Sequence, residues 1–234
     1  MKISVIIPTL NEATNIQQLI PHLLQYGQQH LAEIVVVDGG STDETINIAK
    51  KLGVMAFKSP KKGRAKQMNF AAQKATGDIL YFVHADTRPP TTFAEDILTA
   101  IEEGFPIGSF RFKFNSNKGL LKINSFFTRF DRLISRGGDQ TLFISKTDFE
   151  ELQGFDEQHR IMEDYEFITR ARKTLSFKIV PKAVIVSARK YEKNNYIRVN
   201  IANGIVYSMF LMGASQDSMI NMYNRLLNIS RYGK

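Results

Sequence analysis

Three acidic residues stand where apolar, strand-like runs end, and carboxylates in such positions can do chemistry. Asp38 follows EIVVV, Asp86 follows ILYFVHA, and Asp164 lies within IMEDYEF. A carboxylate beside a buried strand must find a cation, a hydrogen-bond donor or water, because burying it alone is costly. Each Asp taken singly also suits a turn or a helix N-cap. Their combination predicts a site that holds a nucleotide and a metal ion.

The first half of the chain contains the elements that must position these acids. Strands are predicted at residues 3–7, 34–37, 54–57 and 79–83, with helical patterns between them. Such alternation predicts a mainly parallel sheet with right-handed connections and helices on both faces. Ligands of these sheets bind beyond the carboxyl ends of the strands, where Asn11, Asp38 and Asp86 would all lie.

The second half departs from this alternation. Residues 108–115 and 141–146 read as further strands that join the sheet in mixed or antiparallel pairing. Helices are expected at 146–153 and from about residue 163 to about residue 173. Residues 177–187 suggest a last pair of short strands around Pro181.

Composition excludes several classes of protein. The chain has 234 residues, no cysteine and a hydrophobic content of 43%, which fits one α/β domain and excludes thiol chemistry. No run reaches the ~18 apolar residues of a spanning helix, and the amino-terminal run is too short for a signal peptide. We therefore expect a cytoplasmic protein. Its net charge of +8 favours anionic partners, but neither basic cluster matches a motif that reads nucleic-acid bases.

The tail from about residue 195 has a helical pattern with a wide apolar stripe. Ile197, Ile201 and Ile205 share one side, and a second side carries Val199, Ala202, Val206, Met209 and Phe210. A stripe of this kind usually packs in a core or against a second copy in a homodimer. The other interpretation is a helix lying peripherally on the inner face of the cell membrane.

Several motifs together resemble the family 2 glycosyltransferases with the GT-A fold. They are SVIIPTLNE, VVVDGGSTDET, VHADT, GFDE and EDYEF, in the family's order over roughly the first 190 residues. The resemblance implies a GT-A domain over residues 1–194, with residues 195–234 as a helical extension packed on or continuing it. FVHADT and SARKYE are also similar to a bacterial subgroup. Related branches of that subgroup act on lipid-like or carotenoid acceptors.

The resemblance implies a nucleoside diphosphate sugar as the donor substrate. Pro8, Asn11, Glu12 and Asp38 would hold its base and ribose. An Asp at a strand end can accept the imide N–H of uracil, so a UDP-sugar is expected. Gly39 and Gly40 permit close approach of the backbone. Lys61 and Lys62 are expected to be solvated. The residues implied on the diphosphate side are Arg64, for its guanidinium, and Gln67.

Asp86 is the implied metal ligand, for Mn²⁺ or Mg²⁺. One carboxylate is enough, because phosphate oxygens of the donor and water complete the shell of a hard divalent ion. His84 stands where the family has an acid. Its ring can bond the ribose or phosphate, ligate the metal, or serve only the structure.

Asp164 is the implied general base of an inverting transfer, taking the proton of an acceptor hydroxyl. Glu163 would orient Asp164 or cap the helix, and from sequence alone the two roles can be exchanged. Asp139 and Gln140 resemble an acceptor-side loop that contacts the transferred sugar. Arg189, with its neighbours Lys190 and Tyr191, would either close over the diphosphate or face solvent.

Two other functional classes remain open at this stage. A nucleotidyltransferase can use a similar sheet, but it usually has a glycine-rich, basic loop after its first strand, and PTLNE contains no glycine. A non-catalytic module that binds a nucleotide sugar or a membrane surface would not need the complete set of acids. The sequence therefore favours the transferase, with an acceptor that it does not identify.

Overall fold

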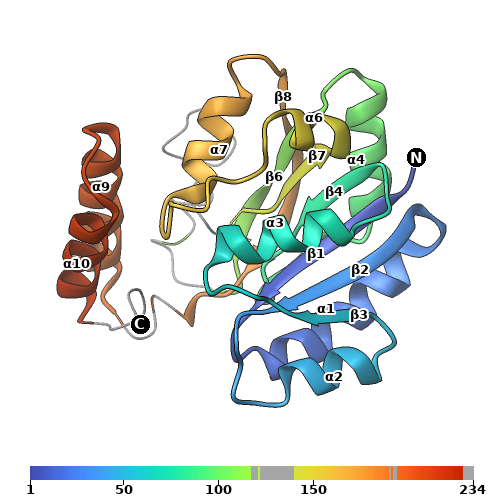
Figure 1. The fold of residues 1–234 in the computed structure, drawn as a ribbon, viewed down its shortest axis with the longest axis horizontal. Helices are drawn as coiled ribbons and strands as arrows, with labels where there is room; N and C mark the ends of the chain where they lie inside the picture. The colour runs from blue at the N-terminus through green and yellow to red at the C-terminus, as the bar shows by residue number, and fades with distance from the viewer. Residues whose placement is uncertain (117–120, 122–139, 190, 192–193, 229–234) are drawn as a thin grey trace.

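The computed structural model describes the chain except for residues 117–120, 122–139, 190, 192–193 and 229–234 (Figure 1). Its centre is an eight-stranded sheet with the order β3-β2-β1-β4-β7-β6-β8-β5. The strands are β1 (Ile3–Thr9), β2 (Leu31–Asp38), β3 (Met55–Lys58), β4 (Ile79–Phe82), β5 (Thr87–Arg88), β6 (Ile107–Phe114), β7 (Leu142–Ser145) and β8 (Phe177–Val186). The helices include α1 (Ala13–Gly27), α2 (Thr45–Lys51), α3 (Arg64–Lys74), α4 (Phe93–Glu102), α6 (Lys146–Glu151), α7 (Glu163–Ala171), α9 (Tyr196–Leu211) and α10 (Gln216–Leu227).

The first four strands, β1 to β4, are parallel to one another, as predicted. Strand β1 lies between β2 and β4, and β2 also pairs with β3. Thr9 at the end of β1 is in register with Asp38 at the end of β2. Because the strands share one direction, their carboxyl ends meet at one edge of the sheet, and the polar residues that follow them are brought together there.

The other half of the sheet is mixed, which confirms the expectation for residues 108–115 and 141–146. Strand β7 runs antiparallel to β4 and β6, whereas β6 and β8 are parallel. The predicted pair of short strands around Pro181 is wrong. Phe110 pairs with Val180 and Arg111 with Ala183, so Pro181 lies in a bulge within the single strand β8. A bulge accommodates a residue that has no N–H to donate.

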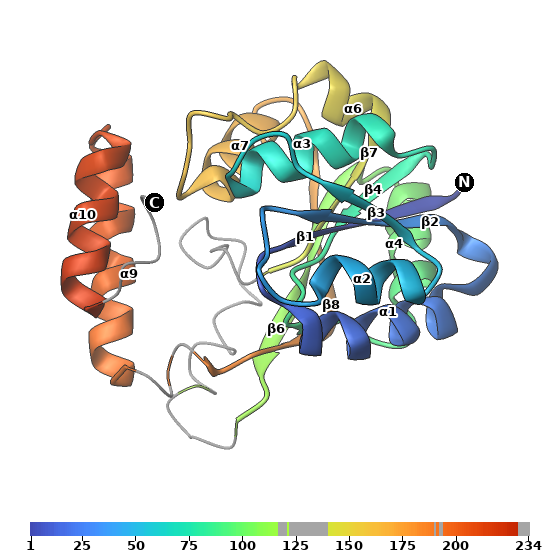
Figure 2. The same cartoon turned by 60° about the horizontal axis from the view of Figure 1, so that its bottom comes forward.

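Helices cover both faces of the sheet, with α3, α6 and α7 on one side and α1, α2 and α4 on the other (Figure 2). The alternation of β1 explains why both faces are apolar. Ile3, Val5 and Ile7 belong to the core cluster on the α1 side, and Ile6 belongs to the cluster with α3 and α7. All four are 0% exposed, and full burial of such a side chain stabilises the fold by about 1.5–3 kcal/mol.

Helices α9 and α10 form a hairpin that stands beyond the carboxyl ends of β1, β2 and β4 in both views (Figures 1 and 2). The Gln216 Oε1 atom of α10 accepts hydrogen bonds from the backbone N–H groups of Arg160, at 3.1 Å, and Ile161, at 3.2 Å. Arg160 also forms an ion pair with Asp217. The hairpin is thus tied to the segment that leads into α7. Among the described helices, none is long and apolar enough to cross a membrane.

Candidate active site

The loop after β1 is fastened to the loop after β2. The Gly39 N–H donates to the Thr9 carbonyl at 2.8 Å, and the Asn11 N–H donates to the Ser41 hydroxyl at 2.7 Å. In return, the Asn11 side-chain oxygen accepts from the Thr42 N–H at 2.8 Å. Asn11 has a φ of 55°, in the left-handed region that Asn tolerates well. The structure therefore brings Asn11 and the Asp38 turn together, as the sequence predicted.

Asp38 is 2% exposed, and its carboxylate organises its own turn. Its Oδ2 accepts hydrogen bonds from the N–H groups of Gly40, at 2.9 Å, and Ser41, at 2.8 Å, while Oδ1 accepts from the Ser41 hydroxyl. Gly40 has a φ of 104°, which only glycine adopts without strain. Asp38 thus fixes the shape of the turn. Its expected contact with a nucleotide base stays a prediction.

Gln67 supports the turn that Asp38 forms after β2. Its side chain is buried, and its Nε2 donates to the carbonyls of Thr9, at 2.9 Å, and Val37, at 2.8 Å. A Cβ atom on Gly39 would come within 3.1 Å of the Gln67 amide, so glycine at this position permits the close approach. Pro8 is half-buried near the end of β1. Gln67 therefore holds the ends of β1 and β2 together, a role that the sequence did not reveal.

Arg189 connects two of the predicted site acids. Its Nη2 atom lies 2.9 Å from Asp86 Oδ2 and 3.2 Å and 3.3 Å from the two carboxylate oxygens of Glu12. Asp86 follows β4, Glu12 precedes α1, and Arg189 follows β8. His84 is half-buried, and its carbonyl accepts the Thr87 N–H at 3.0 Å, which closes the turn that carries Asp86. One guanidinium therefore gathers three loops at the edge of the sheet.

Asp86 could offer a metal ion one carboxylate, and a substrate would have to supply most of the other ligands. Among the described residues, no three His, Cys, Asp or Glu side chains are grouped so that they could hold a metal. The Asp86 side chain is 34% exposed, however, and can offer a carboxylate oxygen. Its present cation is the Arg189 guanidinium. A divalent ion that used Asp86 would need oxygens from a diphosphate and would compete with Arg189.

The second half of the site lies at the start of α7. Glu163 is 2% exposed, and its Oε1 lies 3.1 Å from Nη1 of Arg64, the first residue of α3. Met162, just before Glu163, has a φ of 61°, an uncommon conformation for a side chain of its size. Arg64, expected on the diphosphate, is thus paired with an acid of the EDYEF segment. Its partner is far away in sequence, so no local pattern could have shown the pair.

Asp164 is half-buried, and its Oδ1 accepts the N–H of Tyr165 at 2.9 Å. Burial raises the pKa of Asp164 to about 7; the Glu163 carboxylate also raises it, and Arg64 opposes both. A carboxyl group with a pKa near neutrality can take a proton from an acceptor and release it again. Perturbed groups of this kind mark functional sites more often than chance.

Helix α7 is held in place by contacts that the sequence analysis missed. Asn69 of α3 donates to the Phe155 carbonyl at 2.8 Å and accepts the Phe155 N–H at 2.9 Å. Arg170 donates to the Gly154 carbonyl at 2.8 Å and forms an ion pair with Glu166 at 2.7 Å. These contacts fix the GFDE segment between α3 and α7. The Asn69–Phe155 contacts join segments that are distant in sequence, so no local pattern indicated them.

Aromatic side chains of α9 pack against Tyr165, the residue after Asp164. The Tyr165 ring lies 5.2 Å from Tyr207 and 6.3 Å from Phe210, both on α9, and Phe210 lies 6.2 Å from His159, between ring centroids. The contacts join the carboxyl-terminal hairpin to the helix that begins with the two acids.

The remaining residues that the sequence analysis singled out have varied surroundings. Gln140 is buried and accepts from the Ser109 hydroxyl of β6 at 3.3 Å, and its expected contact with the transferred sugar stays a prediction. Asp139 and Lys190 lie outside the described residues. Tyr191 is buried, 5.1 Å from the Phe114 ring. Lys61 is exposed, as expected, and is 3.6 Å from Glu157.

Comparison with known proteins gives consistent results. The family model described as "Glycosyl transferase family 2" matches residues 4–171. A dolichol-phosphate mannosyltransferase of Pyrococcus furiosus is 32% identical over 112 residues, which cover 46% of this chain and 32% of that protein. The chain thus spans about a third of the length of this relative.

Solved structures share the fold. A crystal structure of Staphylococcus aureus TarS with UDP superposes with a TM-score of 0.65 at 21% identity, covering 99% of this chain and 73% of that one. Glucosyl-3-phosphoglycerate synthase of Mycobacterium tuberculosis, with Mn²⁺ and UDP, gives a TM-score of 0.65 at 15% identity, covering 97% and 80%. The mixed sheet and its flanking helices are therefore those of the GT-A fold.

Proposed function

Since the chain belongs to glycosyl transferase family 2, we propose that it transfers a sugar from a nucleoside diphosphate sugar, with UDP as the nucleotide, to an acceptor. The observation that carries the proposal is the arrangement at one edge of the sheet. There the fastened loops after β1 and β2 and the Asp86–Arg189–Glu12 cluster lie at the carboxyl ends of the strands. Asp164, with its raised pKa, stands at the start of α7.

The donor would lie against the fastened loops. The turn built by Asp38, and Asn11 opposite it, offer backbone and amide groups for the base and ribose, with Pro8 and Gly39 allowing close approach. Arg189 would exchange its carboxylate partners for the diphosphate, since a guanidinium binds phosphate oxygens well. A divalent ion at Asp86 would supply Lewis-acid neutralisation of the leaving diphosphate.

The acceptor would react with inversion. Its hydroxyl oxygen attacks the anomeric carbon from the side opposite the diphosphate, the bond to the diphosphate oxygen breaks, and the hydroxyl proton passes to Asp164. Glu163 and Arg64 act as positioning residues, because their ion pair fixes the start of α7 and sets the charge around Asp164. The nucleoside diphosphate leaves with the electron pair of the broken bond.

The nature of the acceptor is the finer part of the proposal. The relative from Pyrococcus furiosus carries a lipid, dolichol phosphate, in its name, and here rings of α9 pack against Tyr165, the residue after Asp164. We take a lipid-linked hydroxyl, reached by peripheral contact with the inner face of the cell membrane, as the acceptor class to test. The likeness of FVHADT and SARKYE to a bacterial subgroup stays a prediction.

Donor binding is tested by thermal unfolding with a panel of nucleotide sugars. A UDP-sugar should raise the unfolding temperature, because a ligand present at about 100 times its Kd stabilises the folded state by about 2.7 kcal/mol. Replacing Asn11 by Ala, which removes the acceptor for Thr42, should reduce this shift. If GDP-sugars stabilise the protein and UDP-sugars do not, the proposed nucleotide, UDP, is wrong. If neither does, the proposed function fails.

Metal use is tested by binding as well as by turnover. We expect Mn²⁺ to increase the thermal shift caused by UDP in the native chain, and Asp86→Ala to remove that increase. Arg189→Met should make the Mn²⁺ effect appear at a lower metal concentration, because the competing guanidinium is gone. EDTA should lower turnover and added Mn²⁺ restore it. If Mn²⁺ changes the thermal shift equally in the native chain and in Asp86→Ala, Asp86 is not a metal ligand.

A further inference from the structure

An unusual share of the exposed apolar side chains lies on one side of α9. Ile197, Ile201 and Ile205, spaced four residues apart, are 60%, 53% and 36% exposed, and Leu211 and Met212 at the end of the helix are 62% and 77% exposed. We call these five residues the outer face of α9. Of the large hydrophobic residues that are exposed in the described chain, the remaining ones, Met1, Leu10, Leu24 and Met55, are scattered.

The opposite side of α9 already has its partners. Val199, Ala202 and Val206 are 0% exposed and belong to the core cluster that includes Met219 and Ile220 of α10. The outer face is therefore not needed to attach the helix to the protein. A surface helix that is apolar on both sides has a second apolar contact to make, because contiguous exposed apolar surface marks interaction sites.

The charge around the outer face favours an anionic surface as its partner. Helix α9 contains no acidic residue and one basic residue, Arg198, which is exposed. The preceding sequence SARKYEKNN has three basic residues and one acidic residue, and the whole chain carries +8. An exposed apolar helix face in a segment that is basic in sequence is typical of helices that lie in the interface of anionic membranes. A second copy of this chain would instead bring like charges together.

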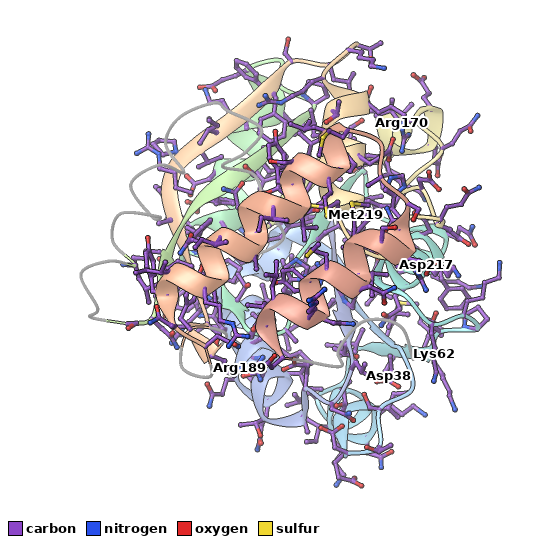
Figure 3. The ribbon with its side chains drawn as sticks, turned by 90° about the vertical axis from the view of Figure 1, so that its left-hand side faces the viewer. Asp38, Lys62, Arg170, Arg189, Asp217 and Met219 are labelled. Carbon is purple, nitrogen blue, oxygen red and sulfur yellow. The ribbon has the colours of Figure 1, made fainter. Side chains whose placement is uncertain are left out.

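The position of the hairpin links this face to the active site. Figure 3 looks at the hairpin from outside, with Arg189 labelled at its lower end. Tyr207 and Phe210 of α9 contact Tyr165, the neighbour of Asp164. The outer face points away from this contact, so a surface bound to it would lie across the hairpin from Tyr165 and Asp164.

We propose that the outer face of α9 docks the protein on an anionic lipid surface, with the three isoleucines and the end of the helix inserted among the headgroups and acyl chains. This proposal names the surface for the membrane contact on which the acceptor part of the proposed function rests, but docking itself needs neither donor nor turnover. If that function also holds, docking brings the protein to the surface that carries a lipid-linked acceptor. The membrane then holds the acceptor and the enzyme at the same surface.

The test is co-sedimentation of the full chain with vesicles of phosphatidylcholine, with and without phosphatidylglycerol. The native chain should bind the anionic vesicles, and added salt should weaken the binding. The double variant Ile201→Gln/Ile205→Gln should bind at least about tenfold more weakly, because two inserted apolar side chains become polar. Its matched control is Leu24→Gln/Met55→Gln, at 46% and 37% exposure elsewhere on the surface, which should bind like the native chain.

Several results would overturn the proposal. Equal vesicle binding by the two double variants would show that the outer face does not dock. Equal binding to vesicles with and without phosphatidylglycerol would show that docking does not depend on anionic lipid. A native dimer that the outer-face variant converts to a monomer, without vesicle binding, would assign the face to a second copy. A thermal shift with a UDP-sugar that both variants retain shows that they are folded and that donor binding is unaffected. Failure of docking is then separate from failure of the proposed function.

Discussion

Replacing Asp164 by Asn is expected to lower kcat for sugar transfer by about 10²–10⁴-fold, the usual contribution of general base catalysis. Asn has nearly the same shape and can keep the hydrogen bond from the Tyr165 N–H. It cannot take a proton from the acceptor hydroxyl. The thermal shift caused by the UDP-sugar should be unchanged, since donor recognition depends on the loops after β1 and β2. Initial rates at saturating donor and acceptor measure the effect.

The matched control is Glu166→Gln, which removes a carboxylate from the same helix and breaks an ion pair with Arg170. Its effect on kcat should be small. Full activity of a folded Asp164→Asn protein would show that Asp164 is not the base. If Glu163→Gln abolishes turnover while Asp164→Asn does not, the roles of the two acids are exchanged.

The pH dependence of the native enzyme follows from the same group. The base must be unprotonated, and burial together with Glu163 raises the pKa of Asp164 to about 7. Because kcat/KM reports the free enzyme, it should fall about tenfold per pH unit below pH ~7. A profile that stays flat down to about pH 5 would mean that Asp164 is ionised throughout this range.

The parts of the fold that sequence predicted are those written in local patterns. The strand that ends at Thr9 and the strand that ends at Asp38 are continuous β-branched or apolar runs, and the polar residues after them mark the edge where ligands bind. The error around Pro181 has a simple cause. Proline usually ends a strand, but a bulge opposite Phe110 and Arg111 removes the need for its hydrogen bond.

The parts of the site that sequence could not predict depend on contacts between distant segments. Gln67 was expected near the donor, but its amide joins the ends of β1 and β2. Arg64 was expected on the diphosphate because guanidinium suits phosphate, and the same chemistry suits the buried Glu163 carboxylate equally well. Residue type restricts the possible partners of a charge. Only the packing of α3 against α7 selects one of them.

The ion pair between Arg64 and Glu163 is expected to control the pKa of Asp164, and its two partners should act in opposite directions. Glu163 raises this pKa and Arg64 lowers it. Glu163→Gln removes the repelling carboxylate, so the acid limb of kcat/KM should move to lower pH. Arg64→Met leaves two carboxyl groups without their cation. Because such a pair binds a proton more tightly as a unit, the acid limb should move to higher pH.

Each displacement should amount to about one pH unit, the lower end of what a nearby charge produces. Arg64→Met should also lower the free energy of unfolding by about 1–3 kcal/mol, because it leaves the buried Glu163 unpaired. Profiles of kcat/KM from about pH 5 to about pH 9 measure the displacements independently of the amount of folded protein, since the midpoint does not depend on concentration. Displacements in the same direction, or none, would show that the pair serves only the structure.

The double variant Arg64→Met/Glu163→Gln separates charge from geometry. It removes both opposing charges while burial still raises the pKa of Asp164, so its acid limb should lie between those of the single variants. If kcat at high pH nevertheless stays low, the ion pair also positions the base, because full ionisation of Asp164 then fails to restore the rate. If kcat at high pH recovers fully, the pair acts on Asp164 through its charge alone, and the Asn69–Phe155 hydrogen bonds suffice to place α7.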